Sequence, residues 1–243
     1  MQSQAELQAR FESAVRQYWT RRDSQSATQS SSGAGDESGR GEVTGGQHLD
    51  PVVELFADLF QQAGFAKESI KTGSSLQLPG YYRPEKKWDL IVIEEGIVVA
   101  AIEFKSQAGP SFGNNFNNRI EEAVGSATDL WVAYREGRLG PERPWLGYFM
   151  LLEEAERSTR AITRRGEPFF PIDPSFRDAS YKRQYEIALE RFLFERLYDA
   201  ACFVTAPRDP SSGQLDEPLA SLSFARFVKL VRGRANAIRL MAE

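Results

Sequence analysis

The chain has 243 residues, 41% of them hydrophobic, and a formal net charge of −4 at pH 7. This length is enough for one substantial core, and we predict a single domain over residues 1–243. The negative net charge argues against unspecific coating of nucleic acid. It does not exclude a local basic groove, because basic residues concentrate in 157–183 and 224–239.

Two residue types that often carry chemistry occur only once. Cys202 lies in the apolar run AACFV and is expected to be small and buried, which excludes a disulfide framework and a cysteine zinc site. His48 is expected to flank a helix, which argues against multi-histidine metal chemistry. No apolar signal core opens the chain, and no run approaches the ~20 apolar residues that span a bilayer. We therefore expect a soluble, cytoplasmic protein with no membrane partner.

The first third of the chain predicts two helices separated by a polar segment. An amphipathic helix is expected around residues 5–19. Residues 21–47 are rich in serine, glycine and charge, which predicts a flexible segment that is either a plain linker or a loop over a ligand. A second helix is expected from Asp50 to about Gly64, with Asp50 as N-cap, Pro51 at the first helical position and Gly64 as its stop.

A β-hairpin follows. The runs WDLIVIE (88–94) and IVVAAIEFK (97–105) predict two strands around a Glu95-Gly96 turn. Because side chains alternate along a strand, Glu103 and Lys105 should share one face.

The register of this hairpin decides whether Asp89 joins Glu103, which follows it after thirteen intervening residues. A two-residue turn alone would set Asp89 opposite Ile102 and leave the two acids on opposite faces. An odd loop or a β-bulge would set Asp89 opposite Glu103. We predict an odd loop or a bulge, with Phe104 pointing into the core.

The rest of the chain alternates between helical and strand patterns. A capping-box-like helix is expected to start at Asn118 and to stop at Gly137. The later expected elements are a strand (145–152), a helix (181–199), a strand (200–205) and a basic amphipathic helix (222–241). This order predicts an α/β fold in which helices flank a mixed central β-sheet.

Two carboxylates that converge at a strand end suit a hard divalent cation. Mg²⁺ prefers oxygen ligands at about 2.0–2.1 Å, and we predict that Asp89 and Glu103 bind it, with the Phe104 backbone carbonyl as a candidate further ligand. Lys105 would stabilise charge on phosphoryl oxygens. The set predicts phosphodiester hydrolysis; the alternative is a solvated sheet edge with charges that block unwanted pairing.

Two stretches of the chain resemble the XhoI-type restriction endonucleases of the PD-(D/E)XK nuclease superfamily. They are LPGYYRPEKKWDL (78–90) and AAIEFKSQAGPSFGNNFNNRIEEAVGSATDL (100–130), and the similarity extends from about Gly45 to Ala201. The GPSFGNNFNNR block is a more specific sign of this family than the three residues Asp89, Glu103 and Lys105. By this resemblance, Asp89 and Glu103 match the metal-binding acids and Lys105 the catalytic lysine, while Trp88 replaces the usual proline.

The resemblance implies a PD-(D/E)XK core and a homodimeric, Mg²⁺-dependent type II restriction endonuclease of the bacterial cytoplasm. It implies cleavage of CTCGAG after the first C, with 5′-phosphate ends and a cognate DNA methyltransferase. Superfamily members often recruit another acid from a helix before the hairpin, which makes Asp50 and Glu54 candidates. The alternatives are a DNA repair or recombination nuclease and a catalytically silent DNA-binding module.

Candidate DNA contacts cluster around the hairpin. Asparagine can pair with adenine edges and arginine with guanine edges, although Gly, Pro, Asn and Ser also populate turns for conformational reasons. Polar and basic residues before Asp89, in the block 109–119 and at the start of the helix at 181 are the candidates. They are Tyr82, Arg83, Lys86, Lys87, Ser111, Asn114, Asn115, Asn117, Asn118, Arg119, Tyr181, Lys182 and Arg183.

Overall fold

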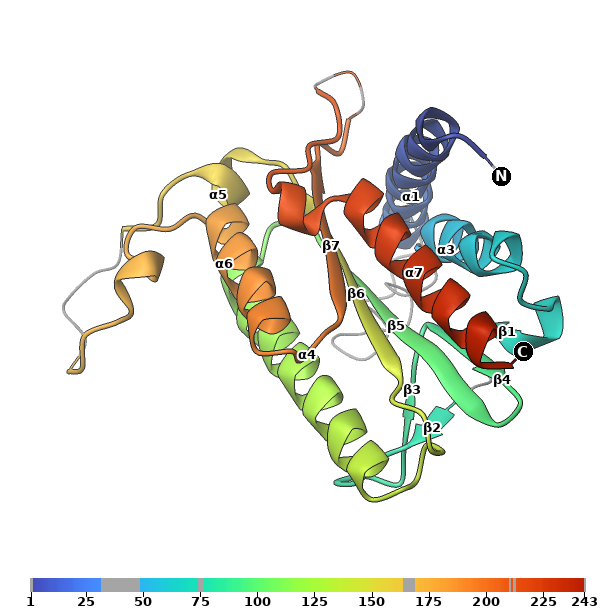
Figure 1. The fold of residues 1–243 in the computed structure, drawn as a ribbon. Helices are drawn as coiled ribbons and strands as arrows, with labels where there is room; N and C mark the ends of the chain where they lie inside the picture. Colours follow the sequence, from blue (N-terminus) through green and yellow to red (C-terminus); the bar gives the residue numbers. More distant parts are fainter. Residues whose placement is uncertain are drawn as a thin grey trace.

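The computed structural model describes residues 2–31, 49–73, 77–163, 169–209, 211 and 213–242. It shows a mixed five-stranded sheet between two layers of helices (Figure 1). The strand order is β1-β4-β5-β6-β7. β4 is antiparallel to β1 and β5, whereas β6 is parallel to β5 and β7. A second, two-stranded sheet pairs β2 with β3. The predicted α/β fold, a mixed sheet flanked by helices, is confirmed.

The elements have the following bounds. The helices are α1 (Gln4–Ser31), α3 (Asp50–Gln62), α4 (Phe112–Arg135), α5 (Glu156–Thr159), α6 (Tyr181–Phe194) and α7 (Phe224–Ala242), with short 3₁₀ turns η1 (Lys67–Ser69), η2 (Pro174–Phe176) and η4 (Ala220–Leu222). The strands are β1 (Ile70–Thr72), β2 (Gln77–Pro79), β3 (Glu85–Lys87), β4 (Leu90–Glu94), β5 (Ile97–Gln107), β6 (Trp145–Glu153) and β7 (Ala200–Ala206). Within the described ranges, no helix is both long and apolar enough to cross a membrane.

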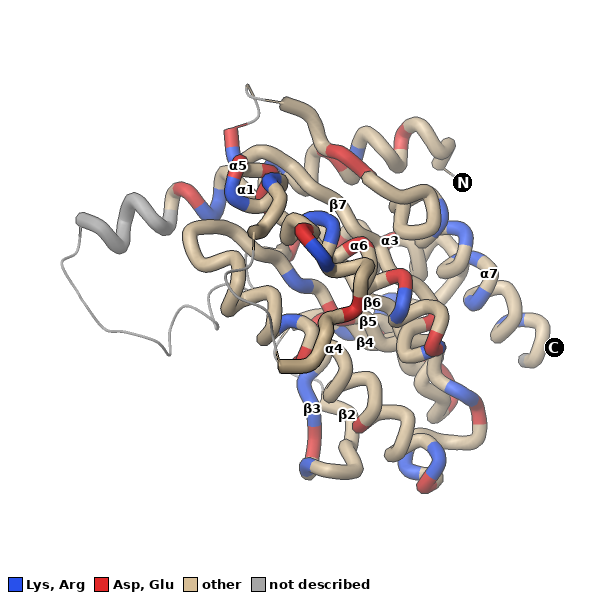
Figure 2. The backbone as a smooth tube through the Cα atoms, turned by 90° about the vertical axis from the view of Figure 1, so that its left-hand side faces the viewer, with Lys and Arg blue, Asp and Glu red and all other residues tan. Residues whose placement is uncertain are grey.

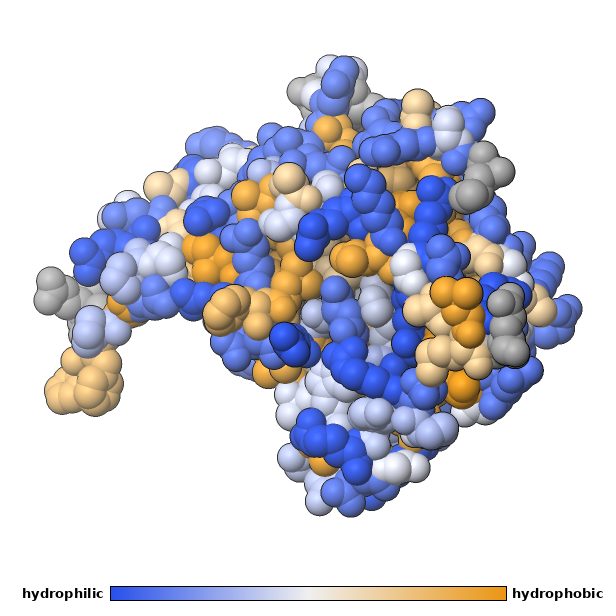
Figure 3. Space-filling view, in the orientation of Figure 1, coloured by the Kyte–Doolittle hydropathy of each residue, from blue (hydrophilic) through white to orange (hydrophobic). Residues whose placement is uncertain are grey.

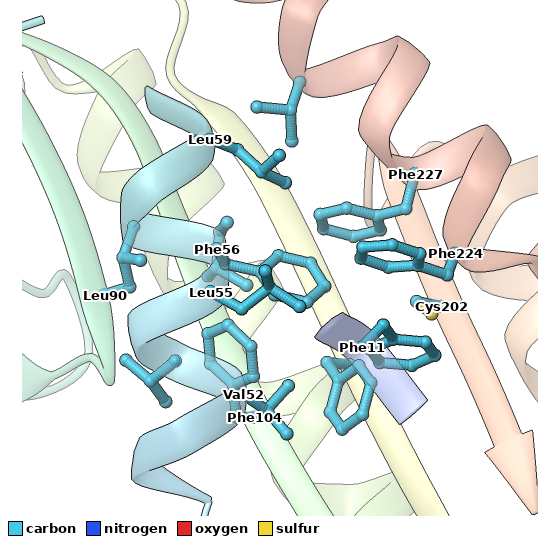
Figure 4. Close-up of a cluster of buried hydrophobic side chains, with 14 of the residues drawn as sticks. Phe11, Val52, Leu55, Phe56, Leu59, Leu90, Phe104, Cys202, Phe224 and Phe227 are labelled. Carbon is cyan, nitrogen blue, oxygen red and sulfur yellow. The ribbon is translucent and has the colours of Figure 1, made fainter. Parts of the chain in front are cut away.

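One face of the sheet is covered by α1, α3 and α7 and forms an apolar core (Figure 4). At its centre the Phe56 ring of α3 contacts Phe104, Phe149, Phe224 and Phe227 at centroid distances between 4.9 and 5.8 Å. Burial of this much aromatic surface makes the face a main source of stability.

The opposite face is covered by α4 and α6 and is partly polar. Ala127 and Leu130 of α4 and Leu189 of α6 belong to its apolar cluster. Glu103 and Gln107 of β5 are nevertheless buried. Buried polar groups need partners, so this face is where a functional site is expected.

The described residues between α5 and α6, 160–163 and 169–180, project from the body of the molecule (Figure 1). Figure 3 shows apolar colour at their tip, and Phe169 and Phe170 in this segment are 94% and 76% exposed. Their rings contact each other at 5.0 Å rather than entering the core. This aromatic pair is therefore apolar surface that the core does not use.

Helix α1 is longer than predicted and continues to Ser31. The flexible segment predicted from residue 21 was therefore wrong over residues 21–31. No glycine or proline occurs between Arg21 and Ser31, so nothing in this stretch breaks a helix. Residues 32–47 and His48 lie outside the described residues.

Helix α3 begins at Asp50 with Leu49 as its N-cap, so the capping role predicted for Asp50 was wrong. The Leu49 carbonyl accepts the first bonds from Val52 and Val53 at 2.8 and 2.9 Å, and the Leu49 side chain is buried. Burial of Leu49 therefore places the N-cap one residue before the predicted cap, Asp50. The predicted stop is confirmed, since Gly64 follows the helix with a φ of 94°.

Helix α4 begins at Phe112, so the predicted start at Asn118 was wrong. Phe112, Phe116 and Ile120 recur every four residues, and all three pack in the core between α4 and α6. This packing outweighs the turn preference of the Gly and Asn residues around them. The block between Phe112 and Asn118 is thus helical.

Helix α6 ends at Phe194, five residues before the predicted end at 199. The Leu197 amide bonds back to the Phe192 carbonyl at 2.9 Å, and Arg196 has a left-handed φ of 56°. This is the Schellman arrangement, which usually places glycine where Arg196 stands. Without a glycine, the sequence carried no stop signal.

Candidate active site

A bulge in the β4–β5 hairpin brings the two acids of the motif together. The turn at Glu95-Gly96 has two residues with positive φ, 51° and 77°, as a type I′ turn requires. The register shifts by one residue further along the hairpin, so that Leu90 pairs with Ile102. Asp89 therefore comes opposite Glu103. The predicted bulge is confirmed, because this turn alone would leave the acids on opposite faces.

The charged groups of the hairpin and Lys86 of β3 form one cluster. Glu103 Oε1 lies 2.6 Å from Lys105 Nζ, and Glu103 Oε2 lies 2.8 Å from Lys86 Nζ. Asp89 Oδ2 accepts a 2.8 Å hydrogen bond from the Phe104 amide. Glu103 is only 5% exposed. The cluster thus holds two carboxylates and two ammonium groups in a poorly solvated place.

In this environment the charged form of the Asp89 carboxyl group is destabilised. Burial, followed by repulsion from Glu103, raises the pKa of Asp89 to about 6. The Phe104 amide, Lys105 and Lys86 oppose this rise without cancelling it. A further positive charge beside Asp89, in addition to Lys105 and Lys86, would favour the charged form of its carboxylate.

Glu103 and Lys105 stabilise each other as an ion pair. Burial alone would raise the pKa of Glu103, but attraction to Lys105 and Lys86 outweighs burial and lowers it. Burial alone would lower the pKa of Lys105, but Glu103 outweighs burial and raises it. Lys105 is therefore an ammonium at neutral pH and can donate hydrogen bonds.

The donor set suits a divalent cation with oxygen ligands. Asp89 and Glu103 provide two carboxylates that repel each other, which is the arrangement that Mg²⁺ relieves. Across the described part of the chain, no group of three or more acidic, histidine or cysteine side chains is arranged to hold a metal ion. The protein thus offers two carboxylates, and further positions would go to water, a backbone carbonyl such as that of Phe104, or a ligand.

Helix α4 presents two different polar ridges beside this cluster. Asn114, Asn117 and Asn118 are exposed and share one ridge, since they are three and four residues apart. Asn115 and Arg119, which share the next ridge, are half-buried. The two ridges separate the asparagines that the sequence presented as one block.

The second ridge of α4 leads to Lys105. Arg119 Nη1 lies 2.7 Å from Glu122, and Glu122 lies 4.0 Å from Lys105 Nζ. The Arg119 Nε atom is buried, and no hydrogen-bond partner for it occurs in the described ranges. The structure thus brings Arg119 beside the charged cluster and leaves it with spare donor capacity.

The loop between β2 and β3 is held by a buried acid of α4. Asp129 accepts hydrogen bonds from the Tyr81 and Tyr82 amides and from Arg83 Nε, all at 2.8 Å. Burial raises the pKa of Asp129, but its bonds to Arg83 and to the two amides lower it overall. At Gly80 an added Cβ would lie 2.6 Å from Asp129 Oδ2, so only glycine fits there. The Tyr82 side chain itself is exposed.

The remaining candidates for DNA contact already have partners or lie open to solvent. The Tyr181 ring stacks on Phe112, Lys182 pairs with Asp216 at 2.7 Å, and Arg183 pairs with Glu186 at 2.7 Å. Ser111 and Lys87 are exposed. Figure 2 shows that, among the described residues, Lys and Arg positions are interspersed with Asp and Glu positions rather than gathered in one basic strip.

Helix α3 covers the apolar face of the sheet, opposite the charged cluster. Asp50 and Glu54 on this helix are both exposed. They form no three-acid group with Asp89 and Glu103 among the residues that the structure describes. A role for either acid at the metal stays a prediction.

The sequence did not reveal three residues that build this site. Lys86 was assigned to DNA phosphates, yet it binds Glu103. Glu122 and Asp129 carried no signal beyond their acidic character, and the structure places both on the inner side of α4. Their spacing of seven residues, two helical turns, is the one feature that could have suggested a shared face.

Comparison with known proteins is consistent with this geometry. A family model described as restriction endonuclease XhoI matches residues 28–217. The type II restriction enzyme BstVI of Geobacillus stearothermophilus is 40% identical over 200 residues, covering 79% of this chain and 89% of its own. The type II restriction enzyme XhoI of Xanthomonas vasicola is 42% identical over 184 residues, covering 74% and 73%.

A third relative adds to this agreement. The type II restriction enzyme AbrI of Azospirillum brasilense is 43% identical over 158 residues, covering 64% of this chain and 71% of its own. No solved structure matches significantly. The family model covers most of the chain, including the whole hairpin with its acids and its lysine. The chain therefore belongs to the XhoI restriction endonuclease family.

Proposed function

We propose that this chain uses Mg²⁺ to cut both strands of DNA at CTCGAG, after the first C, and leaves 5′-phosphate ends. Family membership makes it a type II site-specific deoxyribonuclease. The recognition site and the cut position rest on the resemblance of 78–90 and 100–130 to the family. The observation that carries the chemistry is the bulge that aligns Asp89 with Glu103, beside Lys105.

The chain's own residues have separate tasks in this proposal. Asp89 and Glu103 hold the cation, which supplies positive charge beside the scissile phosphate when it is bound. Lys105 is a protonated ammonium, so it orients the attacking water or donates to a phosphoryl oxygen rather than removing a proton. Arg119, which lies beside Lys105 through their shared partner Glu122, would contact the DNA next to the charged cluster.

DNA recognition in this proposal uses the exposed ridge of α4. Asn114, Asn117 and Asn118 project from the first turns of a helix next to the charged cluster. A helix end of this kind fits the major groove, where asparagine can bond adenine. Lys87 of β3 and Tyr82 of the loop between β2 and β3 are exposed and would contact the sugar-phosphate backbone.

We also propose that two copies act together as a homodimer. A palindrome presents two identical half-sites related by a two-fold axis, and one active site faces one scissile phosphate. A cognate DNA methyltransferase would protect the host's own sites. The dimer rests on the symmetry of the proposed substrate, and the methyltransferase rests on the family resemblance.

Digestion of a plasmid with a single CTCGAG site tests the proposal. We expect linearisation in Mg²⁺, with both strands cut after the first C, and DNA binding without cutting in Ca²⁺. The mapped ends should carry 5′-phosphates, and sedimentation on the site duplex should show two protomers per duplex. Cutting at branched or damaged DNA instead of at the intact palindrome would replace this proposal with a repair nuclease.

Matched variants test the recognition ridge. Asn117→Ala should weaken binding to CTCGAG by about 1–3 kcal/mol while leaving scrambled duplexes almost unaffected. Lys87→Ala should weaken binding to both duplexes and lower the salt dependence by about one phosphate contact. Equal losses on both duplexes for Asn117→Ala would contradict base reading by this ridge.

A further inference from the structure

Lys86 is the residue of β3 that turns inward. Its neighbours Glu85 and Lys87 are exposed, whereas the Lys86 side chain is 12% exposed. Its Nζ atom lies 2.8 Å from Glu103 Oε2, donates to the Lys87 carbonyl at 2.9 Å and lies 4.4 Å from the centre of the Trp88 ring. Three simultaneous contacts hold this ammonium in place.

Lys86 is paired with the Glu103 carboxylate, which the proposed cation would need as a ligand. Both oxygens of Glu103 face an ammonium, Oε1 facing Lys105 and Oε2 facing Lys86. Two negative charges, on Asp89 and Glu103, are thereby matched by two positive ones. A divalent cation that entered this balanced cluster would lie within a few Å of like charges in a poorly solvated place, where repulsion is strong.

Lys86 and Lys105 differ in how firmly each is placed. Lys105 belongs to β5, which is hydrogen-bonded on both sides within the five-stranded sheet. Lys86 belongs to the separate two-stranded sheet, whose loop carries the exposed Tyr82. Lys86 is therefore the ammonium that can leave Glu103 at the smaller structural cost, and β3 is next to the loop that a DNA backbone would meet.

We propose that Lys86 holds Glu103 in the DNA-free protein and moves to a DNA phosphate when the substrate binds, so that cation binding depends on DNA. The Lys86 ammonium then pairs with the DNA phosphate instead of Glu103, and the freed Glu103 oxygen can bind the cation. Lys86 is thus a positioning residue that delays loading of the active site until the target is bound. This inference rests on the proposed assignment of Asp89 and Glu103 as cation ligands.

Ca²⁺ titration of the DNA-free protein by calorimetry tests the inference without any cleavage. Lys86→Gln should bind Ca²⁺ at least about tenfold more tightly than the unchanged protein, because one opposing charge is gone. Adding a CTCGAG duplex should tighten Ca²⁺ binding strongly in the unchanged protein and much less in Lys86→Gln. By linkage, Ca²⁺ should then strengthen DNA binding less in the variant.

Three further variants separate charge from structure. Lys87→Gln, the exposed neighbour, and Lys86→Arg, which keeps the charge, should both leave weak Ca²⁺ binding in the DNA-free protein. Lys86→Met keeps the apolar stem over Trp88 and should reproduce the tighter binding, and it stands in if Lys86→Gln does not fold.

Unchanged or weaker Ca²⁺ affinity in both charge-removing variants would overturn the inference. If the unchanged protein binds Ca²⁺ in the presence of DNA, that outcome would leave the proposed function standing. If the unchanged protein neither binds Ca²⁺ with DNA nor cuts DNA in Mg²⁺, the proposed function itself fails.

Discussion

The two faces of the central sheet carry different tasks, and strand β5 takes part in both. On one face Phe104 enters a wholly apolar cluster with α3 and α7 (Figure 4). On the other face its two neighbours, Glu103 and Lys105, form the charged cluster with Lys86. Side-chain alternation places these opposite environments within three consecutive residues.

The comparison teaches how a buried charged cluster can be tolerated. Burying two carboxylates and two ammonium groups is costly, and their mutual pairing recovers only part of that cost. The apolar face is densely packed, with Phe56 in contact with four other rings. Stability should therefore come mainly from the α3–α7 face, and chemistry from the α4–α6 face.

The largest expected effect is on the charged face. Lys105→Met keeps the apolar stem and removes the ammonium, so cleavage should fall by at least about 10²–10³ while DNA binding stays nearly unchanged. Single-turnover plasmid cleavage and fluorescence anisotropy measure the two quantities. Lys229→Met, an exposed lysine of α7 outside the proposed DNA-binding residues, is the matched control and should keep most of the cleavage rate. Near-normal cleavage by Glu103→Ala would falsify the assignment of this cluster as the active site.

The next effect lies on the apolar face. Phe56→Ala should lower the free energy of unfolding by about 3–5 kcal/mol, because it empties the centre of the aromatic cluster. Urea unfolding measures this loss. The cleavage rate per folded molecule should stay close to normal at low temperature. A fully folded Phe56→Ala protein that cannot cut DNA would show that the two faces are not separate.

The pH dependence of the stability of Asp89→Asn tests how costly the charged cluster is. The folded pKa of Asp89, about 6, lies above its ordinary value of 3.8, so the charged form is disfavoured by folding. The resulting loss of stability is complete above pH 6, shrinks as the pH falls from 6 to 3.8 and is absent below 3.8.

Without divalent ions, Asp89→Asn should thus be more stable than the unchanged protein at pH 8. The gain is up to about 3 kcal/mol, at about 1.4 kcal/mol for each pKa unit. Urea unfolding at pH 8 and at pH 5 measures it, and the gain should be smaller at pH 5. A variant that is less stable at pH 8 would mean that the lysines favour charged Asp89 more than burial disfavours it.

The smallest expected effect concerns Cys202, which is fully buried on the apolar face, where burial raises the pKa of its thiol. Cys202→Ser should lower the free energy of unfolding by about 1–3 kcal/mol, because it buries a hydroxyl among apolar groups. Cleavage should be nearly unchanged. Complete loss of catalysis in a folded Cys202→Ser protein would mean that the thiol takes part in the chemistry.

Much of the site could be predicted from local pattern. Asp89, Glu103 and Lys105 were recognisable from their spacing and from strand alternation, and the need for a bulge followed from the same alternation. The start of α4 could not be predicted in the same way. Its first turns contain Gly113 and several asparagines, and only their packing against α6 makes them helical.

The sequence by itself determined the α/β class, the hairpin with its acids and lysine, and the family resemblance, because alternation, helical spacing and turn chemistry act between near neighbours. Only the tertiary structure decided that Lys86 meets Glu103, that Asp129 holds the Tyr81–Arg83 loop, and that Arg119 faces the charged cluster. Lys86 and Glu103 are 17 residues apart in the sequence, and Arg119 and Lys105 are 14 apart. Asp129 is 46 to 48 residues from the loop residues that it binds. Contacts over such separations depend on how sheets and helices pack, and periodicity along the chain does not encode them.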